Sequence, residues 1–328
     1  MQPFEFVKTT DPTQAIRLAA APGSMYLGGG TNLLDLMKGN VARPSRLIDI
    51  MSLPLAEIVP LPDGGLKIGS LARNSDVANH PHVRRDFPLL AEALLAGASP
   101  QLRNMATVGG NLLQRTRCSY FVDTVFDKCN KREPGSGCAA RSGYNRMHAI
   151  LGASDACVAT NPSDMNVALM ALDAVVHVQG PARSRTVPIG DFHRLPGSTP
   201  ERDTDLAPGE LITAVELPAS PFAGHSRYVK VRDRASFAFA LVSVAVALSL
   251  AGETVRDCRI VLGGVAPKPG RVPEAEAALR GQVLDAARLA AAADLAPTGA
   301  RPLADNEFKV ELARRAVSRA LRGAAGLA

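Results

Sequence analysis

The chain has 328 residues, of which 46% are hydrophobic and 4% aromatic, and its formal net charge is +6 at pH 7. This length allows two compact domains, and the small aromatic fraction leaves most packing to Ala, Val and Leu, which suits layered α/β structure. The basic residues are scattered without interleaved aromatics, which argues against nucleic-acid binding, and the longest apolar stretch, residues 237–251, is too short to span a bilayer.

The first fifty residues predict a small βαβ-like unit. A helix is expected over residues 11–21, because Asp11 suits an N-cap and Pro12 suits the first turn. Short apolar strands are expected at 25–27 and 46–50, with a short helix over 32–38 between them. A run of three glycines, Gly28 to Gly30, joins the first of these strands to that helix.

The middle of the chain predicts a hairpin, several helices and one irregular segment. Residues 62–65 read Pro-Asp-Gly-Gly and indicate a tight turn between strands at 58–61 and 66–68. Further elements are expected as helices over 74–79, 88–96 and 165–172, a glycine turn over 108–111, and strands at 175–178 and 211–217. Residues 115–156 lack a periodic apolar pattern and predict a loop-rich insertion. A segment of this length without regular structure is usually functional or disordered, and its cysteines favour a function.

The last hundred residues predict a separate small domain. Strands are expected at 228–232, 241–250 and 258–262, and helices over 273–280, 284–293 and 306–321. This order predicts an antiparallel sheet with helices on one face, beginning near residue 222.

Two glycine loops are candidates for a phosphate-bearing ligand. The first is Gly28-Gly29-Gly30-Thr31-Asn32-Leu33, and the second is residues 106–112, Ala-Thr-Val-Gly-Gly-Asn-Leu. Glycines let backbone N–H groups approach phosphate oxygens, and a helix N-terminus adds a favourable dipole. The P-loop pattern is excluded because no Gly-Lys-Ser/Thr follows, and the dinucleotide fingerprint is matched only in part, since Leu33 replaces its third glycine. Each loop alone could be a plain turn, but two together favour a bipartite cofactor site.

These loops resemble those of the FAD-binding subunit of the xanthine dehydrogenase and carbon monoxide dehydrogenase family, the molybdenum hydroxylases. Further matches follow in family order at 161–164 (Asn-Pro-Ser-Asp), 209–218, 228–230 (Tyr-Val-Lys) and 263–267 (Gly-Gly-Val-Ala-Pro). The resemblance implies an α+β fold, in which a two-subdomain PCMH-type FAD-binding fold precedes a C-terminal domain with a small antiparallel sheet and helices. The expected bounds are 1–52 and 53–220 for the two FAD-binding subdomains and 221–328 for the C-terminal domain.

The resemblance also implies which residues bind FAD. The first loop would cradle the pyrophosphate, and the second would lie near the isoalloxazine and ribityl chain. Lys230 has a rationale of its own, because a cation near the ring stabilises an anionic reduced flavin, although a solvated strand residue is the alternative. Family members often have alanine at Gly28 or Gly29, a small difference that is not expected to harm phosphate approach. The full expected set is Tyr26, Leu27, Gly28, Gly29, Gly30, Thr31, Asn32, Leu33, Leu34, Thr107, Gly110, Asn111, Asp164, Ile212 and Lys230.

Four cysteines lie within the predicted insertion, whose expected bounds are 115–158: Cys118, Cys129, Cys138 and Cys157. Four thiolates suit a [4Fe–4S] cluster, a [2Fe–2S] cluster or structural zinc, although the closely paired cysteines typical of zinc are missing; unliganded thiols are the remaining alternative. The insertion resembles that of the FAD-binding subunit of bacterial periplasmic aldehyde oxidoreductases, and this implies a [4Fe–4S] cluster on these four residues. Cys258, in an apolar strand, is expected to be a buried structural thiol.

The resemblance implies an electron-transfer function rather than substrate chemistry. The chain would carry FAD in a heterotrimeric molybdenum-containing aldehyde oxidoreductase, passing electrons from a molybdenum cofactor-binding large subunit and a [2Fe–2S] small subunit to an external acceptor. No catalytic side chain is expected, because the sequence has no nucleophile elbow and no persuasive carboxylate pair. The alternatives are the flavin subunit of a hydroxybenzoyl-CoA reductase-like enzyme, a stand-alone FAD dehydrogenase, and a non-enzymatic zinc module.

The expected location follows from the same resemblance. The first residues lack a basic region followed by an apolar one, so no signal peptide and no membrane association are expected. The resemblance implies export to the periplasm together with a signal-bearing partner, and a cytoplasmic location is the alternative.

Overall fold

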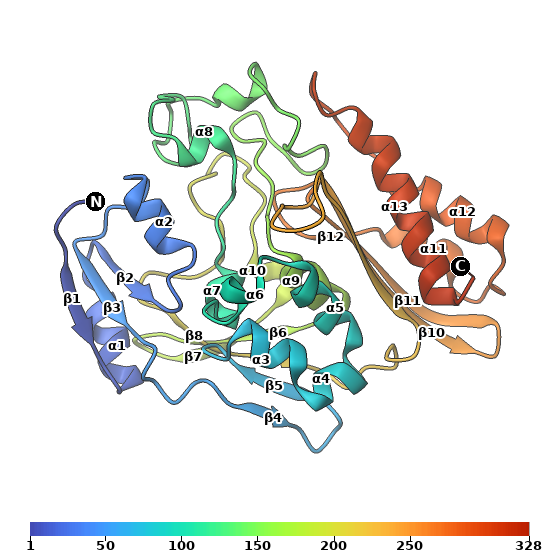
Figure 1. Ribbon diagram of the computed structural model, residues 1–328, viewed down its shortest axis with the longest axis horizontal. Coiled ribbons are helices and arrows are strands. Elements are labelled where there is room, and N and C mark those ends of the chain that lie inside the picture. The colour runs from blue at the N-terminus through green and yellow to red at the C-terminus, as the bar shows by residue number, and fades with distance from the viewer. Residues whose placement is uncertain (328) are drawn as a thin grey trace.

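The first sheet comes from the N-terminal fifty residues. In the computed structural model, which describes residues 1–327, strands β1 (Glu5–Lys8), β2 (Ser24–Leu27) and β3 (Arg46–Asp49) form a parallel sheet in the order β1-β3-β2 (Figure 1). Helices α1 (Pro12–Ala19) and α2 (Leu33–Lys38) connect them. Asp11 caps α1 as predicted, because its carboxylate accepts from Thr13 N at 2.9 Å. Strand β1 was not predicted, since it buries little of its surface and has no clear alternation.

A second, five-stranded antiparallel sheet lies beside the first and has the order β4-β5-β8-β6-β7. Its strands are β4 (Ile58–Pro60), β5 (Leu66–Gly69), β6 (Val175–Gln179), β7 (Ser184–Pro188) and β8 (Leu211–Leu217). Helices α3 (Asn74–Asn79), α4 (Pro81–Asp86), α5 (Pro88–Ala96), α6 (Pro100–Arg103), α7 (Val108–Leu112) and α10 (Ile189–Phe192) surround it. The predicted glycine turn at 108–111 is wrong, because Thr107 caps a helical turn there and accepts from Gly110 N at 3.2 Å.

Helix α9 (Asp164–Ala171) is the centre of the main core, and all eight of its residues are buried. The Ser163 hydroxyl caps it by accepting from Asn166 N at 3.1 Å. The helix packs between α5 and the third sheet, so it connects the FAD-binding part of the expected fold with the C-terminal part.

The third sheet is antiparallel with the order β12-β11-β10-β9. Its strands are β9 (Ser226–Val231), β10 (Val242–Ala251), β11 (Thr254–Gly263) and β12 (Gly270–Arg271), and helices α11 (Pro273–Leu279), α12 (Ala286–Asp294) and α13 (Phe308–Ala325) follow. Successive side chains of β10 point to opposite faces. Val242, Val244, Val246 and Leu248 pack against these helices, whereas Ala245 and Ala247 pack into the main core. The predicted α+β class with a small C-terminal sheet is confirmed, and both faces of this sheet are covered.

Residues 113–163 are mostly irregular and form the top of the molecule in Figure 1. Their regular structure is limited to α8 (Ser119–Val122) and a 3₁₀ turn, η1 (Ala139–Arg141). None of the helices within residues 1–327 is both long and apolar enough to cross a membrane.

Two residues near the start of α13 hold this irregular segment against the C-terminal domain. The buried Lys309 ammonium donates to the carbonyl oxygens of His148 and Gly264 at 2.9 and 2.8 Å. The Asn306 side chain donates to the carbonyl of His148 at 3.2 Å. Burial, together with the charge of Arg146, lowers the pKa of Lys309 from 10.5 to about 7.

Lys309 therefore predicts a pH-dependent stability. Between pH 7 and 10.5 the unfolded chain holds the Lys309 proton more tightly than the folded protein does, so stability should rise with pH. For each pH unit, Lys309 adds at most about 1.4 kcal/mol to the free energy of unfolding. Denaturant unfolding of the flavin-loaded protein at pH 7, 8 and 9 should show a steeper rise for the wild type than for Lys309→Met. Equal slopes in the two proteins would contradict the assignment.

Candidate functional site

The two glycine loops pack back to back. A Cβ placed on Gly29 would overlap the Met105 carbonyl oxygen and lie 2.7 Å from its carbonyl carbon, just before the second loop. A Cβ on Gly28 would meet the hydroxyl of Thr107 at 3.0 Å. Gly30 has a φ of +75°, which favours glycine. In this backbone an alanine at position 29 would clash, because the main chains of the two loops touch there.

A chain of hydrogen bonds ties the second loop to helix α9. The Ser163 hydroxyl donates to the Asn111 side-chain oxygen at 2.7 Å and also caps α9. Asn111 lies on α7 and Asp164 is the first residue of α9. The predicted second loop and the predicted Asp164 segment are thus held at a fixed separation.

A cavity of about 710 Å³ lies in front of these segments. Six of the predicted flavin residues line it: Thr31, Asn32, Gly110, Asn111, Asp164 and Lys230. The remaining nine are not among the residues that line it. Ile212 is buried in β8 opposite Val178, and the Tyr26 hydroxyl donates to the Gly209 carbonyl at 2.9 Å.

Other lining residues were not predicted. Residues 97–103, between α5 and α7, and residues 233–239, in the loop from β9 to β10, contribute to the cavity wall. Phe237 and Phe239 come from the second of these segments, and Phe237 has a φ of 50°. Two phenylalanines so close together in a chain with ten in total were a usable signal, although they match no motif.

Asp164 and Lys230 form an ion pair at the cavity. Lys230 Nζ lies 2.8 Å from Asp164 Oδ2, and both side chains are less than a tenth exposed. The Tyr228 hydroxyl donates to the other carboxylate oxygen at 2.7 Å. Lys230 is therefore a buried, paired cation rather than a solvated strand residue.

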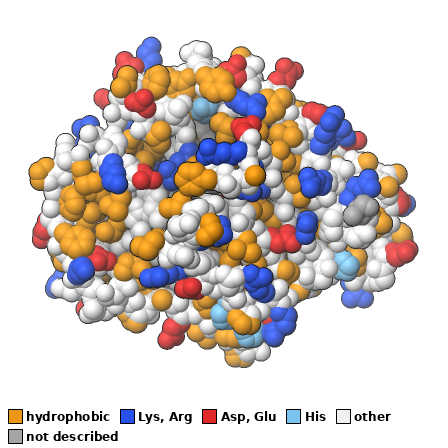
Figure 2. All heavy atoms as spheres, viewed as in Figure 1, with side chains coloured by type: hydrophobic (Ala, Val, Ile, Leu, Met, Phe, Trp, Pro, Cys, Tyr) orange, Lys and Arg blue, Asp and Glu red, His pale blue; other side chains and the backbone are white. Residues whose placement is uncertain are grey.

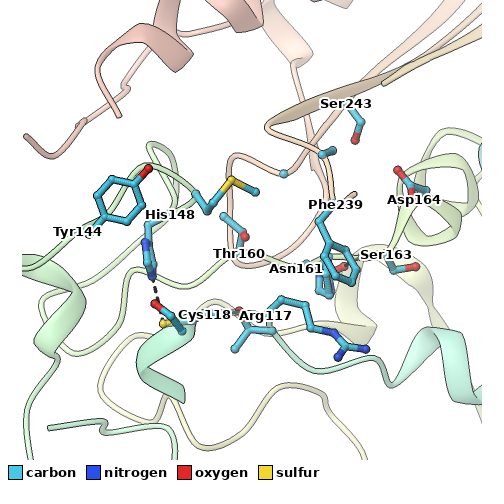
Figure 3. Close-up of a pocket in the computed structure, with 16 residues that line it drawn as sticks. Arg117, Cys118, Tyr144, His148, Thr160, Asn161, Ser163, Asp164, Phe239 and Ser243 are labelled. Carbon is cyan, nitrogen blue, oxygen red and sulfur yellow. Dashed lines mark hydrogen bonds between the residues drawn. The ribbon is translucent and has the colours of Figure 1, made fainter. Parts of the chain in front are cut away.

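A second cavity of about 260 Å³ adjoins the first and reaches the cysteine-containing segment. The two cavities share Arg117, Met147, Pro162, Asp164 and Phe239 among their lining residues. In Figure 3, His148 and Cys118 lie on one side of this space, and Phe239, Ser163 and Asp164 lie on the other. The Arg117 guanidinium stacks over the Phe239 ring at 5.2 Å.

The four predicted cysteines are free thiols, and Cys129 and Cys138 face each other across an antiparallel bridge. Burial raises the pKa of Cys118 to about 12, and the neighbouring Cys129 and Cys157 thiols add to the increase. Burial also raises the pKa of Cys157, opposed by the charge of Lys131 and supported by Cys138 and Cys129. Among residues 1–327, no group of three or more His, Cys, Asp or Glu side chains is placed to hold a single metal ion.

Hydrogen bonds within the loop hold the backbone around these thiols in place. Residues Cys129 and Cys138 form an antiparallel bridge, and the Asn130 side-chain oxygen accepts from the backbone of Gly135 and Gly137 at 3.1 and 2.8 Å. The Asn130 amide donates to the carbonyl of Ala156, next to Cys157, at 2.9 Å. Hydrogen bonds of this kind fix the loop without regular secondary structure.

Charged residues attach the loop to the rest of the molecule. Asp203 accepts from Arg115 at 2.7 Å and from Lys131 at 2.5 Å. Burial alone would raise the pKa of Asp203, but these two cations hold it below its usual value.

The surface also carries exposed hydrophobic side chains, including Phe6 and Met25, and Figure 2 shows such side chains gathered over the three-stranded sheet.

Two further buried residues, Cys258 and His148, contact a backbone carbonyl and a predicted cysteine. Cys258 is fully buried and its thiol donates to the Glu276 carbonyl at 3.3 Å, which confirms a buried structural thiol. His148 Nε2 lies 3.0 Å from the Cys118 sulfur. Burial lowers the pKa of His148, which lies among the residues that line the second cavity.

Comparison with known proteins agrees with this architecture. Residues 2–220 match the family model described as FAD binding domain in molybdopterin dehydrogenase, and residues 227–324 match the carbon monoxide dehydrogenase flavoprotein C-terminal domain. The chain is 50% identical over 323 residues to the aldehyde oxidoreductase FAD-binding subunit PaoB of Escherichia coli (strain K12), covering 98% of each chain. It is 27% identical to the carbon monoxide dehydrogenase medium chain of Hydrogenophaga pseudoflava, covering 98% of this chain and 96% of that one.

Solved structures give the same result. A carbon monoxide dehydrogenase from Hydrogenophaga pseudoflava, solved without the Mo-pyranopterin moiety of its cofactor, superposes with a TM-score of 0.77 at 28% identity and covers 99% of this chain and 98% of its own. A quinoline 2-oxidoreductase from Pseudomonas putida 86 also gives a TM-score of 0.77, at 25% identity, with 99% and 98% coverage.

Proposed function

Because the chain belongs to the FAD-binding family of the molybdopterin dehydrogenases, we propose that it is the FAD-carrying subunit of a molybdenum-containing aldehyde oxidoreductase. The observation that carries this proposal is the pair of glycine loops, packed against each other at Gly29 and facing one cavity with Asp164 and Lys230. The identity of half the residues to an aldehyde oxidoreductase subunit over nearly its whole length supports the substrate class.

The residues around the cavity fit FAD. The first loop offers backbone N–H groups without side chains, which suits a pyrophosphate. Thr31, Asn32, Gly110 and Asn111 supply polar groups along the cavity, and Lys230 supplies a cation. FAD, when bound, supplies the capacity to accept and release electrons, and the chain positions it and shields it from water. We propose the fifteen residues from Tyr26 to Lys230 named above as its environment.

The proposed partners are a molybdenum cofactor-binding large subunit and a [2Fe–2S] small subunit. Relatives named as medium chains or FAD-binding subunits support this, since such names describe parts of larger assemblies. Electrons from the partners would reach an external acceptor through the flavin. We also propose the domain bounds 1–52, 53–220 and 221–328, supported by the division of the two family matches between residues 220 and 227.

We further propose that Cys118, Cys129, Cys138 and Cys157 hold a [4Fe–4S] cluster. Their thiols are free, adjacent and enclosed by a hydrogen-bonded loop. The closely paired cysteines typical of structural zinc are missing from this segment, which favours a cluster over zinc. When bound, the cluster would supply a one-electron carrier, and the chain supplies its ligands and the buried His148 beside Cys118.

The proposed location is the periplasm, with export alongside a signal-bearing partner, and the cytoplasm is the alternative. The support is the resemblance of the cysteine insertion to that of periplasmic aldehyde oxidoreductases. Fractionation of cells expressing the whole complex decides between the two compartments.

One set of measurements tests the proposal as a whole. An optical spectrum of the anaerobically purified complex should show flavin bands over a broad iron–sulfur shoulder, and analysis should give one FAD and about four irons per chain beyond those of the [2Fe–2S] partner. Flavin without this iron would remove the cluster and keep the FAD-subunit proposal. Zinc without flavin would overturn both.

Two alternative functions have their own signatures. Bleaching of the flavin by an organic substrate in the isolated chain would favour a stand-alone FAD dehydrogenase. Reduction of a hydroxybenzoyl-CoA thioester by the purified complex, with no aldehyde oxidation, would favour the reductase-like enzyme.

A further inference from the structure

Buried Tyr228 donates a hydrogen bond to the Asp164 carboxylate, which also pairs with Lys230 at the flavin cavity. Tyr228 and Lys230 are two residues apart on strand β9, so both side chains point to the same face. Each donates to one oxygen of the Asp164 carboxylate, Tyr228 to Oδ1 at 2.7 Å and Lys230 to Oδ2 at 2.8 Å. Lys230 also donates to the Ala96 carbonyl at 3.1 Å. The carboxylate that faces the cavity is therefore held from two sides.

Tyr228 is a hydrogen-bond donor to Asp164 in this position. Burial, and then the charge of Asp164, raises the pKa of Tyr228 well above its ordinary value, and the nearby Ser243 hydroxyl opposes this only in part. The raised pKa favours the protonated phenol that the hydrogen bond to Asp164 requires. Its proton lies toward Asp164, because that oxygen is the anionic acceptor.

The hydrogen bond from Tyr228 has two effects on Asp164. It withdraws negative charge from the carboxylate, and it fixes the rotamer that presents Oδ2 to Lys230. A carboxylate beside a flavin opposes the negative charge gained on reduction, whereas a cation favours it. Reducing the negative charge of the Asp164 carboxylate makes the bound flavin easier to reduce, and so does holding the Lys230 ammonium in place.

We propose that Tyr228 is a positioning residue that raises the reduction potential of FAD through Asp164 and Lys230. This proposal rests on the FAD site proposed above. Tyr228 does not line the 710 Å³ cavity and is not among the residues expected to touch the cofactor.

The test is Tyr228→Phe in the complete complex, because this change removes the hydroxyl and keeps the ring. The flavin midpoint potential, measured by spectroelectrochemical titration, should fall. A hydrogen bond to a charged group is stronger than one to a neutral group, and its loss is expected to shift the two-electron equilibrium about tenfold, or about 30 mV. Asp164→Asn should shift the potential in the opposite direction, because it removes the negative charge.

A double variant separates positioning from packing. In the Asp164→Asn background, Tyr228→Phe should cause little further shift, since the hydroxyl acts through the carboxylate. An unchanged potential in Tyr228→Phe, with a lower unfolding temperature, would show a purely structural residue and overturn the proposal. If Tyr228→Phe does not fold, a lower potential in Asp164→Asn alone would overturn it. A wild-type complex without FAD would instead refute the proposed function.

Discussion

Replacing Gly29 with alanine is expected to remove FAD from the protein, whereas alanine at Gly28 should leave it bound. The added methyl group at position 29 would overlap the Met105 carbonyl, a backbone group that cannot rotate away. At position 28 the methyl group would meet the Thr107 hydroxyl at 3.0 Å, and a side chain can give by a few tenths of an ångström. The same one-carbon change therefore has different costs at adjacent positions.

Overpacking destabilises a structure by about 1–3 kcal/mol, and the clash at Gly29 is expected to lie at the upper end of this range. This corresponds to an about hundredfold loss of FAD affinity. FAD released per chain and the FAD dissociation constant should be measured on both variants of the purified complex. Gly28→Ala is the matched control, because it adds the same group one residue away in the same loop. Wild-type affinity in Gly29→Ala would mean that the two loops are not in backbone contact.

This contrast shows what the amino-acid sequence could and could not predict about the site. The glycine run and the second loop were recognisable because glycine is required where backbones or phosphates come close. Which glycine makes the backbone contact depends on how residues 28–30 meet Met105, some seventy-five positions later, and only packing decides that.

In the fold too, elements with clear local sequence patterns could be predicted, whereas elements without such patterns were missed. Strands β2 to β6 and helices α1, α5 and α9 follow from apolar patterns, caps and turn residues that are local in the chain. Strand β1 was missed because it buries little surface, and α7 was taken for a turn because glycines disfavour helices until Thr107 caps them.

Side chains that act through distant partners were the hardest to predict. Tyr228 is a strand residue by its local pattern, and only its hydrogen bond to Asp164, sixty-four residues away, gives it a role. Lys309 similarly belongs to an amphipathic helix, yet it is buried on the carbonyls of His148 and Gly264. Such pairings carry no signal in a single sequence.

Replacing Cys157 with serine is expected to remove most of the iron assigned to this chain and to leave FAD in place. A hydroxyl is a poor ligand for an iron–sulfur cluster, so iron should fall from about four per chain toward zero. The flavin cavity does not include Cys157, and hence FAD content should stay near one per chain. Iron analysis and low-temperature electron paramagnetic resonance of the reduced complex measure both effects.

Cys258→Ser is the matched control for this prediction. Cys258 is buried as well, and a serine hydroxyl at that position can donate to the same Glu276 carbonyl. It lies on β11 in the C-terminal core, away from the other four thiols. Iron retained in Cys258→Ser and lost in Cys157→Ser would therefore report ligation rather than general loss of folding. Full iron in Cys157→Ser would exclude this residue as a ligand, and loss of iron in both variants would point to unfolding.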